Sequence, residues 1–470
     1  MRHFSPATGI LLAVLIPLMG CVPEESTHWS ADGRQGVLWV DGKLYFHDEI
    51  SGQTIRLTEN EVTGYPTISA DGKWLAWGEA EKFADLERAE KALTPAEARQ
   101  LRADADKARG QIQKAGNLDK AAKQLQEELP DQELPWIARI LARDNPELFQ
   151  PEPNVLRDIG KAEVAIHRLQ VAAADQPERP TTVGRSIFHQ SVNPKFSPDN
   201  RYLAFQTSGK DEVYQLHVLD RETHAIIKIA DLTALGYSWR RDSRALAYLR
   251  AVDMEKVIHD FALGHLVETQ VANEQKSLLT KPLEGNAKPN RIDTREFAGE
   301  SRNLAEILFH PACQAEYLEG NNLLFQSGMA TLPRNMGKER IIAGLFRLAP
   351  GGSITKVDDV SDENLLIRLS PDKQLLLYSE EGQFRLLNLA DNSRRFIEGP
   401  RAAVDPNRYE LVNCNWKGNE QLVGIYKLKD QPKPEPNQPR APSLPTRKVL
   451  VFNRDGKVIG DLVPDLPSSY

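Results

Sequence analysis

Short runs of alternating apolar residues, separated by polar turns, recur along most of this chain. Each run follows an apolar anchor, two small or polar residues, an acidic or turn residue, and then Gly, Asn or Lys. Such alternation over about four to eight residues is typical of a half-buried β-strand. Clear copies of the pattern begin at Trp29, Ile68, Phe196, Trp239 and Leu369, and weaker copies begin at Tyr317 and Trp416.

The middle of each copy has the composition of a tight hairpin turn. Ser followed two residues later by Asp, as at Ser370 and Asp372, begins a turn with hydrogen bonds from side chain to backbone. Gly or Asn, as at Gly33 and Asn200, tolerates the left-handed conformation that follows. Most copies continue into two more strands, which gives a unit of about 40 residues. The repeat predicts an all-β fold over residues 29–466, a seven-bladed β-propeller, with six or eight blades left open.

The best copies also point to a family. The segments that start at Ser197 and Ser370 resemble the Ser-Pro-Asp-Gly-Lys repeats of TolB-type propellers, which are relatives of the WD-repeat proteins. The resemblance covers roughly two-thirds of the chain and is specific to a fold rather than to a function. TolB proteins carry an α/β domain before the propeller and no lipid anchor, whereas here the first repeat starts within ten residues of Cys21. The family's role in an envelope complex therefore does not transfer directly.

A charged, Ala-rich insertion interrupts the second blade over residues 80–160. Leu101, Ala105, Ala108 and Ile112 recur at helical spacing, as in a coiled-coil seam. Residues 94–97 read as a capped helix start, and a second helix is expected after residue 117. The insertion is expected to be an α-helical hairpin. Its narrow apolar seam either packs the hairpin on itself or serves as an arm that docks a partner.

Two further segments depart from the repeat. Residues 273–312 read as an irregular connection between the fourth and fifth blades. Residues 430–447 form a Pro-rich loop in blade 7, in which Pro432, Pro434 and Pro436 favour an extended polyproline conformation. This loop is either a solvated connection or a ligand for a Pro-binding module. All three insertions are expected on one face of the propeller, which makes that face the binding-face hypothesis.

The N-terminus predicts where the protein is located. Residues 1–20 read as a signal peptide with an apolar core too short to span a bilayer. Leu18, Gly20 and Cys21 resemble the lipobox of bacterial lipoproteins, which implies that Cys21 is the acylated first residue of the mature chain and that residues 21–28 are a tether. Val22 in place of Asp favours the outer membrane, with the body of the protein facing the periplasm.

Composition narrows the possible partners. A formal net charge of -7 argues against nucleic acid, which requires a basic field. Cys313 and Cys414 are expected to be free, buried thiols, because they fall in blades that are not neighbours. The remaining expectations are a membrane attachment through the lipid, a protein partner in the envelope and no cofactor.

No common enzyme signature is present in the sequence. The recurring Asp residues of the turns read as structural. His259, Asp260 and His265 form the only dense His/Asp group, and His189, His217 and His310 are further candidates for a channel. The first hypothesis is a non-catalytic propeller lipoprotein that acts as an interaction scaffold or ligand-binding module. The alternative is a propeller lyase or hydrolase that cleaves an extracellular polysaccharide or peptide through channel-facing histidines.

Overall fold

A computed structural model describes most of the predicted propeller. The described residues are 25–115, 137, 140–141, 164–186, 191–208, 214–258, 261–271, 300–331, 340–359, 367–380, 383–397, 404–429 and 446–462. Within these ranges the regular structure is mainly β-strand, which confirms the all-β prediction. None of the helices described here is long and apolar enough to cross a membrane.

The first two sheets along the chain are antiparallel. The first sheet has four strands in sequence order, β1 (Ser26–Trp29), β2 (Gln35–Val40), β3 (Lys43–Asp48) and β4 (Gln53–Arg56). The second sheet contains β5 (Glu61–Val62), β6 (Thr67–Ile68), β7 (Trp74–Phe83), β8 (Val164–Ala173) and β9 (Thr181–Ser186), with β5 and β6 both paired to β7.

The third sheet is the largest, because one long strand, β13 (Ile226–Trp239), pairs with strands on both sides and joins two four-stranded units. Its strands are β10 (Ser191–Phe196), β11 (Tyr202–Ser208), β12 (Tyr214–Asp220), β13, β14 (Ala245–Ile258), β15 (Phe261–Gln270) and β16 (Ser301–Phe309). The first part of β13 pairs with β12, and its last residues pair with β14. This strand therefore ends one four-stranded unit and begins the next.

Three four-stranded sheets complete the chain. The first contains β17 (Ala315–Tyr317), β18 (Leu323–Thr331), β19 (Arg340–Leu348) and β20 (Ile354–Asp359). The next contains β21 (Arg368–Leu369), β22 (Leu375–Glu380), β23 (Gln383–Asn388) and β24 (Arg394–Phe396). The last contains β25 (Tyr409–Lys417), β26 (Gln421–Leu428), β27 (Arg447–Asn453) and β28 (Val458–Asp461).

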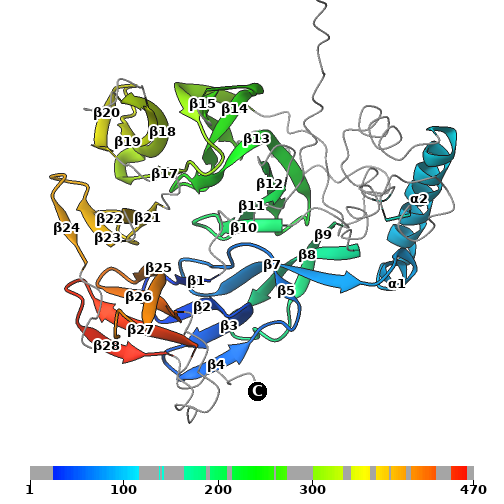
Figure 1. The fold of residues 1–470 in the computed structure, drawn as a ribbon, viewed down its shortest axis with the longest axis horizontal. Helices are drawn as coiled ribbons and strands as arrows, with labels where there is room; N and C mark the ends of the chain where they lie inside the picture. Colours follow the sequence, from blue (N-terminus) through cyan, green and yellow to red (C-terminus); the bar gives the residue numbers. More distant parts are fainter. Residues whose placement is uncertain are drawn as a thin grey trace, which may run out of the picture.

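The sheets follow one another around a common centre (Figure 1). The first strand of each unit lies innermost: β1 contacts β25 and β6, β10 contacts β6 and β13, and β13 contacts β17. Contact between β1 and β25 brings the first and last sheets together. Antiparallel sheets arranged radially in this way form a β-propeller, which confirms the predicted type of fold.

The hairpin turns form as the repeat predicts. The hydroxyls of Ser30, Ser197 and Ser370 each donate a hydrogen bond of 2.6 Å to the Asp two residues later. That carboxylate also accepts from the backbone N–H two residues further on, as at Gln374 (3.2 Å). The residue directly after each Asp has a left-handed backbone conformation, with φ of 73° at Gly33, 60° at Asn200 and 58° at Lys373. The repeated Asp side chains thus hold turns, and the structural interpretation of them is correct.

Two helices project from the second sheet between the paired strands β7 and β8. They are α1 (Leu86–Lys91), capped by Asp85, and α2 (Pro95–Ala115). The predicted capping box forms, because Glu97 accepts from the backbone N–H of Thr94 (3.0 Å) and Thr94 accepts from that of Glu97 (3.4 Å). Glu97 also pairs with Arg185 on β9 (2.6 Å), which ties α2 to the sheet. The second helix expected after residue 117 lies outside the described residues.

The seam residues of α2 have little exposed surface. Leu101, Ala108 and Ile112 are buried, and Ala105 is half-buried. In the described part of the arm, Ala89 of α1 and Ile140 pack with Val164 and Ile166 of β8 in one apolar cluster. Because three of the four seam residues are buried and the fourth is half-buried, they do not form an exposed docking surface.

Three predicted boundaries are wrong. The insertion expected from residue 80 begins after Phe83, because β7 extends to that residue. Ser26–Trp29 form β1 rather than a tether, so the propeller starts earlier than predicted; the polar residues of this innermost strand hid it from a search for apolar runs. The loop predicted over residues 430–447 ends before Arg447, which begins β27, and residues 430–445, with Pro432, Pro434 and Pro436, lie outside the described ranges.

The prediction for residues 273–312 is also wrong. Ser301–Phe309 form β16, which pairs antiparallel with β15 as an outer strand. Its first residues are exposed and polar, so the sequence lacks the apolar alternation of an inner strand. The residues between β15 and β16 therefore connect the third and fourth strands of one unit. Successive connections in an antiparallel sheet emerge at opposite ends, so this segment does not share a face with the helical arm.

A buried carboxylate joins the first two sheets. Glu79 on β7 is 5% exposed and accepts hydrogen bonds from Thr58 (2.7 Å), Asn60 (3.1 Å), Trp77 (3.2 Å) and Gln170 (2.9 Å). Burial raises the pKa of Glu79, but the four hydrogen-bond donors together lower it by more than burial raises it. The pKa of Glu79 therefore lies below its usual value. The ionised form of Glu79 therefore stabilises the connection between β4 and β5.

We expect Glu79→Gln to lower the free energy of unfolding by about 2–3 kcal/mol near neutral pH, since hydrogen bonds to a charged group are lost. Because the folded-state pKa is depressed, this contribution is present above the unfolded-state pKa of about 4.3 and is lost as pH falls through the folded-state value. Urea denaturation at several pH values measures both effects. Glu61→Gln is the control, because Glu61 is an exposed residue of β5 whose surface ion pair with Lys82 (2.8 Å) contributes little. Its expected change is within about 0.5 kcal/mol. A difference between wild type and Glu79→Gln that stays constant down to about pH 3 would contradict this role.

Candidate ligand-binding cavity

The innermost strands present alternate residues to the centre of the propeller. His28 and Ser26 lie two and four residues before the turn residue Ser30, and Lys195 and Asn193 occupy the same positions before Ser197. Alternate side chains of a strand share one face, so these two positions line the channel in each unit. The other described residues at these positions are Tyr65, Thr67, Gly236, Ser238, Gln314, Glu316, Arg368, Asn413 and Asn415.

Most of these residues surround one cavity of about 200 Å³. Every one of them except Thr67 and Ser238 lines it, together with Leu235 and Ile367. The volume corresponds to roughly six or seven waters at about 30 Å³ each. It suits a small polar molecule rather than a drug-sized one, whose pockets begin at about 300 Å³.

One part of the lining consists of amides that are fixed by the backbone. Asn193 donates to the carbonyl of Leu235 (2.7 Å), and Asn413 donates to the carbonyl of Glu25 (2.7 Å). Gln314 accepts from the N–H of Ile367 (3.1 Å). Each of these bonds joins one inner strand to its neighbour. The amides therefore hold a defined orientation before any ligand arrives.

A close approach of two inner strands narrows the cavity at Gly236. A Cβ atom at this position would lie 2.3 Å from the Cβ atom of Gln314. Any side chain here would clash, so β13 and the start of β17 can meet only at glycine. The cavity wall is bare backbone at this point.

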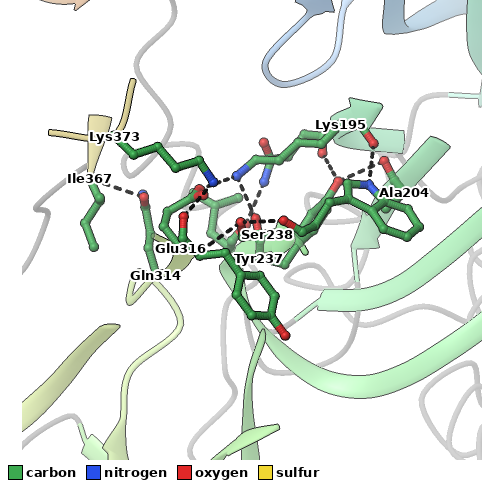
Figure 2. A network of polar contacts seen from close by, with 12 residues as sticks. Lys195, Ala204, Tyr237, Ser238, Gln314, Glu316, Ile367 and Lys373 are labelled. Carbon is green, nitrogen blue, oxygen red and sulfur yellow. Dashed lines mark hydrogen bonds and ion pairs between the residues drawn. The ribbon is translucent and has the colours of Figure 1, made fainter. Parts of the chain in front are cut away.

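Another part of the cavity lining is charged. Lys195 Nζ lies 2.7 Å from Glu316 Oε1 and also donates to the carbonyl of Tyr237 (2.7 Å). Figure 2 shows Lys373, from the turn of the next sheet, extending toward the same group, where it donates to the carbonyl of Tyr317 (2.6 Å). Burial lowers the pKa of Lys373, while the nearby Glu316 raises it.

Arg368 is the second cationic side chain on the cavity wall. It donates through Nη1 to the carbonyl of Cys414, and among the described residues it has no carboxylate partner. Burial lowers its pKa. Four of its five N–H donors have no protein acceptor in the described structure.

His28 lies between these cations. Burial, followed by the charges of Arg368 and Lys195, lowers its pKa from 6.5 to about 3. Its ring lies 6.1 Å from that of Tyr65. Because its pKa is lowered, the His28 imidazole at the cavity is neutral at physiological pH, and neither ring nitrogen makes a hydrogen bond with a described residue.

The described histidines among those singled out from the sequence, His217, His265 and His310, do not line this cavity. His217 is buried on β12, stacked on Phe205 with ring centroids 5.3 Å apart, and bonded to Thr207. His265 lies on β15, and His310 accepts from the N–H of Ala312 (3.2 Å) after β16. His189, His259, Asp260 and Cys21 lie outside the described residues. No group of three or more His, Cys, Asp or Glu side chains in the described ranges could hold a metal ion.

The two internal cysteines are free and buried, as predicted. Burial raises the pKa of both Cys313 and Cys414 to about 12. Such thiols stay protonated at neutral pH and act as small apolar side chains.

The sequence did contain a signal for the cavity. The residues two and four places before each turn vary freely in polarity, whereas the turn itself repeats. These positions do not follow the apolar alternation of the other strands. They also lie apart from the dense group of His259, Asp260 and His265. Reading these two positions from every copy of the repeat would have named His28, Lys195, Glu316 and Arg368.

The chain was compared with known proteins. Its sequence matches no family model and no curated protein. TolB from Acinetobacter baumannii is 11% identical, with 92% of this chain and 77% of TolB covered and a TM-score of 0.36. An oligogalacturonate lyase in complex with manganese is 13% identical, with 76% and 73% covered and a TM-score of 0.40. Prolyl oligopeptidase B from Galerina marginata is 13% identical, with 65% and 43% covered and a TM-score of 0.37. At these TM-scores the three likenesses carry no argument about function.

The imidazole of His28 should remain neutral across the physiological range. We expect its NMR signals to show no titration between about pH 5 and pH 8, because protonation would place a third cation beside Arg368 and Lys195. The signals are assigned by their loss in His28→Gln. An observed midpoint above about pH 5 would contradict the described environment.

Proposed function

We propose that this chain is a non-catalytic, lipid-anchored propeller of the cell envelope that binds a small ligand in its central cavity. The observation that carries this proposal is the cavity wall itself. Its polar side chains come from the innermost segments of successive sheets and are oriented by hydrogen bonds between neighbouring strands. Such preorganisation favours binding because little conformational freedom is lost when a ligand enters.

We infer seven blades in a closed ring, counting β13 in both the third and the fourth blade. Consecutive units share buried apolar clusters all the way around, including one between the last and first sheets that contains Leu38, Tyr45, Val423 and Val449. Hydrogen bonds from Asn413 and Asn415 to the backbone before and within β1 support closure without exchange of strands. A closed ring is a rigid frame for the cavity.

The lining favours binding over catalysis. Catalysis by an acid and base needs two titratable groups with separated pKa values near a reacting atom. In the described cavity the single histidine has its pKa lowered to about 3, and the single carboxylate is paired with Lys195. The lyase or hydrolase alternative requires histidines that face the channel. The described candidates, His217, His265 and His310, do not line the cavity.

Filling the cavity tests the proposal. His28→Trp places a large ring in the space of about 200 Å³. We expect native mass spectrometry of the detergent-solubilised wild-type protein to detect a bound small molecule, and His28→Trp to lose it. Ile50→Trp, at a residue 73% exposed on the outer surface, is the matched control and should retain it.

Circular dichroism and thermal melting verify that both variants are folded. Equal ligand occupancy in His28→Trp and wild type would place the ligand elsewhere and contradict the proposal. A ligand that wild type converts chemically on incubation, and that His28→Trp leaves unchanged, would instead support the enzyme alternative.

The lipid anchor at Cys21 is the second part of the proposal. Cys21 precedes Glu25 by four residues, a reach of at most about 14 Å. Glu25 directly precedes the inner strand β1, which begins at Ser26, and Ser26 lines the cavity. Acylation of Cys21 would therefore hold this end of the channel close to the membrane surface.

We expect Cys21→Ala to abolish incorporation of an alkyne-labelled fatty acid and to release the protein from the membrane fraction. Two or three acyl chains account for the attachment, at about 0.8 kcal/mol per buried methylene. Cys414→Ala is a matched control, because that buried thiol cannot be acylated in the folded protein. Full membrane retention of Cys21→Ala would contradict the lipoprotein assignment.

A further inference from the structure

The charges around the cavity do not balance. Lys195 and Arg368 line it, and Glu316 is the one carboxylate among its described lining residues. Lys373, on the turn between β21 and β22, lies near Glu316 and Glu319. Glu316 lies 2.7 Å from Lys195 and also acts on Lys373, so its charge is already used on that side. Arg368 is left without a counter-charge in the described structure.

Uncompensated guanidinium groups away from bulk water are costly, and protein structures normally pair them. Arg368 is only partly exposed, and its one acceptor is the backbone carbonyl of Cys414. The remaining donors form the planar fork that matches the two oxygens of a carboxylate or phosphate group. The geometry of this side chain thus calls for an oxyanion.

A neutral donor stands on the same wall. Ser26 is 2% exposed, lines the cavity, and its hydroxyl has no hydrogen-bond partner. Buried hydroxyls are rarely left unpaired, since the lost hydrogen bond is not regained from water. A ligand oxygen in the cavity would supply the missing partner.

We propose that the cavity is a binding site for a small oxyanionic ligand, whose carboxylate or phosphate group is held by Arg368 and whose polar remainder contacts Ser26 and the amides of Asn193, Gln314 and Asn413. This inference rests on the proposed binding function and gives the ligand its chemical class. The volume of about 200 Å³ limits that ligand to a compact molecule. Lys195 and Lys373 add a long-range attraction that Glu316 only partly cancels.

The test uses probes that differ only in charge. Succinate and succinamide have nearly the same shape, and inorganic phosphate represents the other oxyanion. Isothermal titration of the full-length protein in detergent should show saturable binding of succinate or phosphate, with at least tenfold weaker binding of succinamide. Binding of phosphate alone, or of succinate alone, identifies which oxyanion the site prefers.

Two substitutions should change affinity in opposite directions. Arg368→Gln removes the charge-assisted hydrogen bonds and should weaken binding of the charged probe by about tenfold or more. Glu316→Gln removes the competing carboxylate and should strengthen it. A loss of structure alone would weaken binding in both variants and could not produce this opposition.

Arg395→Gln is the matched control, because Arg395 lies on the outer strand β24 of the same sheet and pairs with Asp455 (3.0 Å). It should leave affinity unchanged. Should Arg368→Gln fail to fold, the comparison of succinate with succinamide in wild type still decides the point. Equal binding of the two probes, or no binding of either oxyanion, would overturn the inference. A neutral molecule that copurifies with wild type and is lost in His28→Trp would overturn it while leaving the proposed function standing.

Discussion

Each sheet of this protein buries apolar side chains on both of its faces, and this constraint determines the architecture. A four-stranded sheet with two apolar faces needs a neighbour on either side. Clusters such as Leu169 with Leu203, or Leu377 with Cys414, meet that need between consecutive sheets. Because the last sheet requires a neighbour as much as the others, it packs against the first. The central cavity is a consequence of the ring rather than a separate feature.

At the inner edge of such a ring, polar side-chain atoms connect each inner strand to the next. Backbone groups of adjacent inner strands come close but do not pair in a ladder, so side chains bridge them. Trp239 donates to the carbonyl of Lys195 (2.9 Å), and Trp416 donates to that of Arg368 (2.8 Å). The same turn-anchor position thus fixes a cavity residue of the preceding sheet in two places. The Trp residues that anchor the repeat are therefore hydrogen-bonded to the backbone of residues that line the cavity.

The turns could be predicted because their chemistry is local: Ser370 and Asp372 need only each other and the adjacent backbone to form their hydrogen bonds. The capping box of Thr94 and Glu97 is local in the same sense. The strand β16 was missed because an outer strand has one edge and much of its surface in water, so its sequence resembles a loop. The cavity was missed because Ser26 and Arg368 are separated by most of the chain and line one cavity only when the sheets assemble around their common centre. Local pattern therefore predicts the units, and the site arises from their assembly.

The lining of the cavity breaks the symmetry that the repeat creates. Of the pairs of residues at the two inner positions, one is Ser and His, another Asn and Lys, another Gln and Glu, and at Gly236 the wall has no side chain. A ligand turned about the central axis from one unit to the next would exchange a cation for an amide or for bare backbone. The pseudosymmetric frame consequently offers a chiral, one-orientation environment, and such a site distinguishes the mirror-image forms of a ligand as well as its charge.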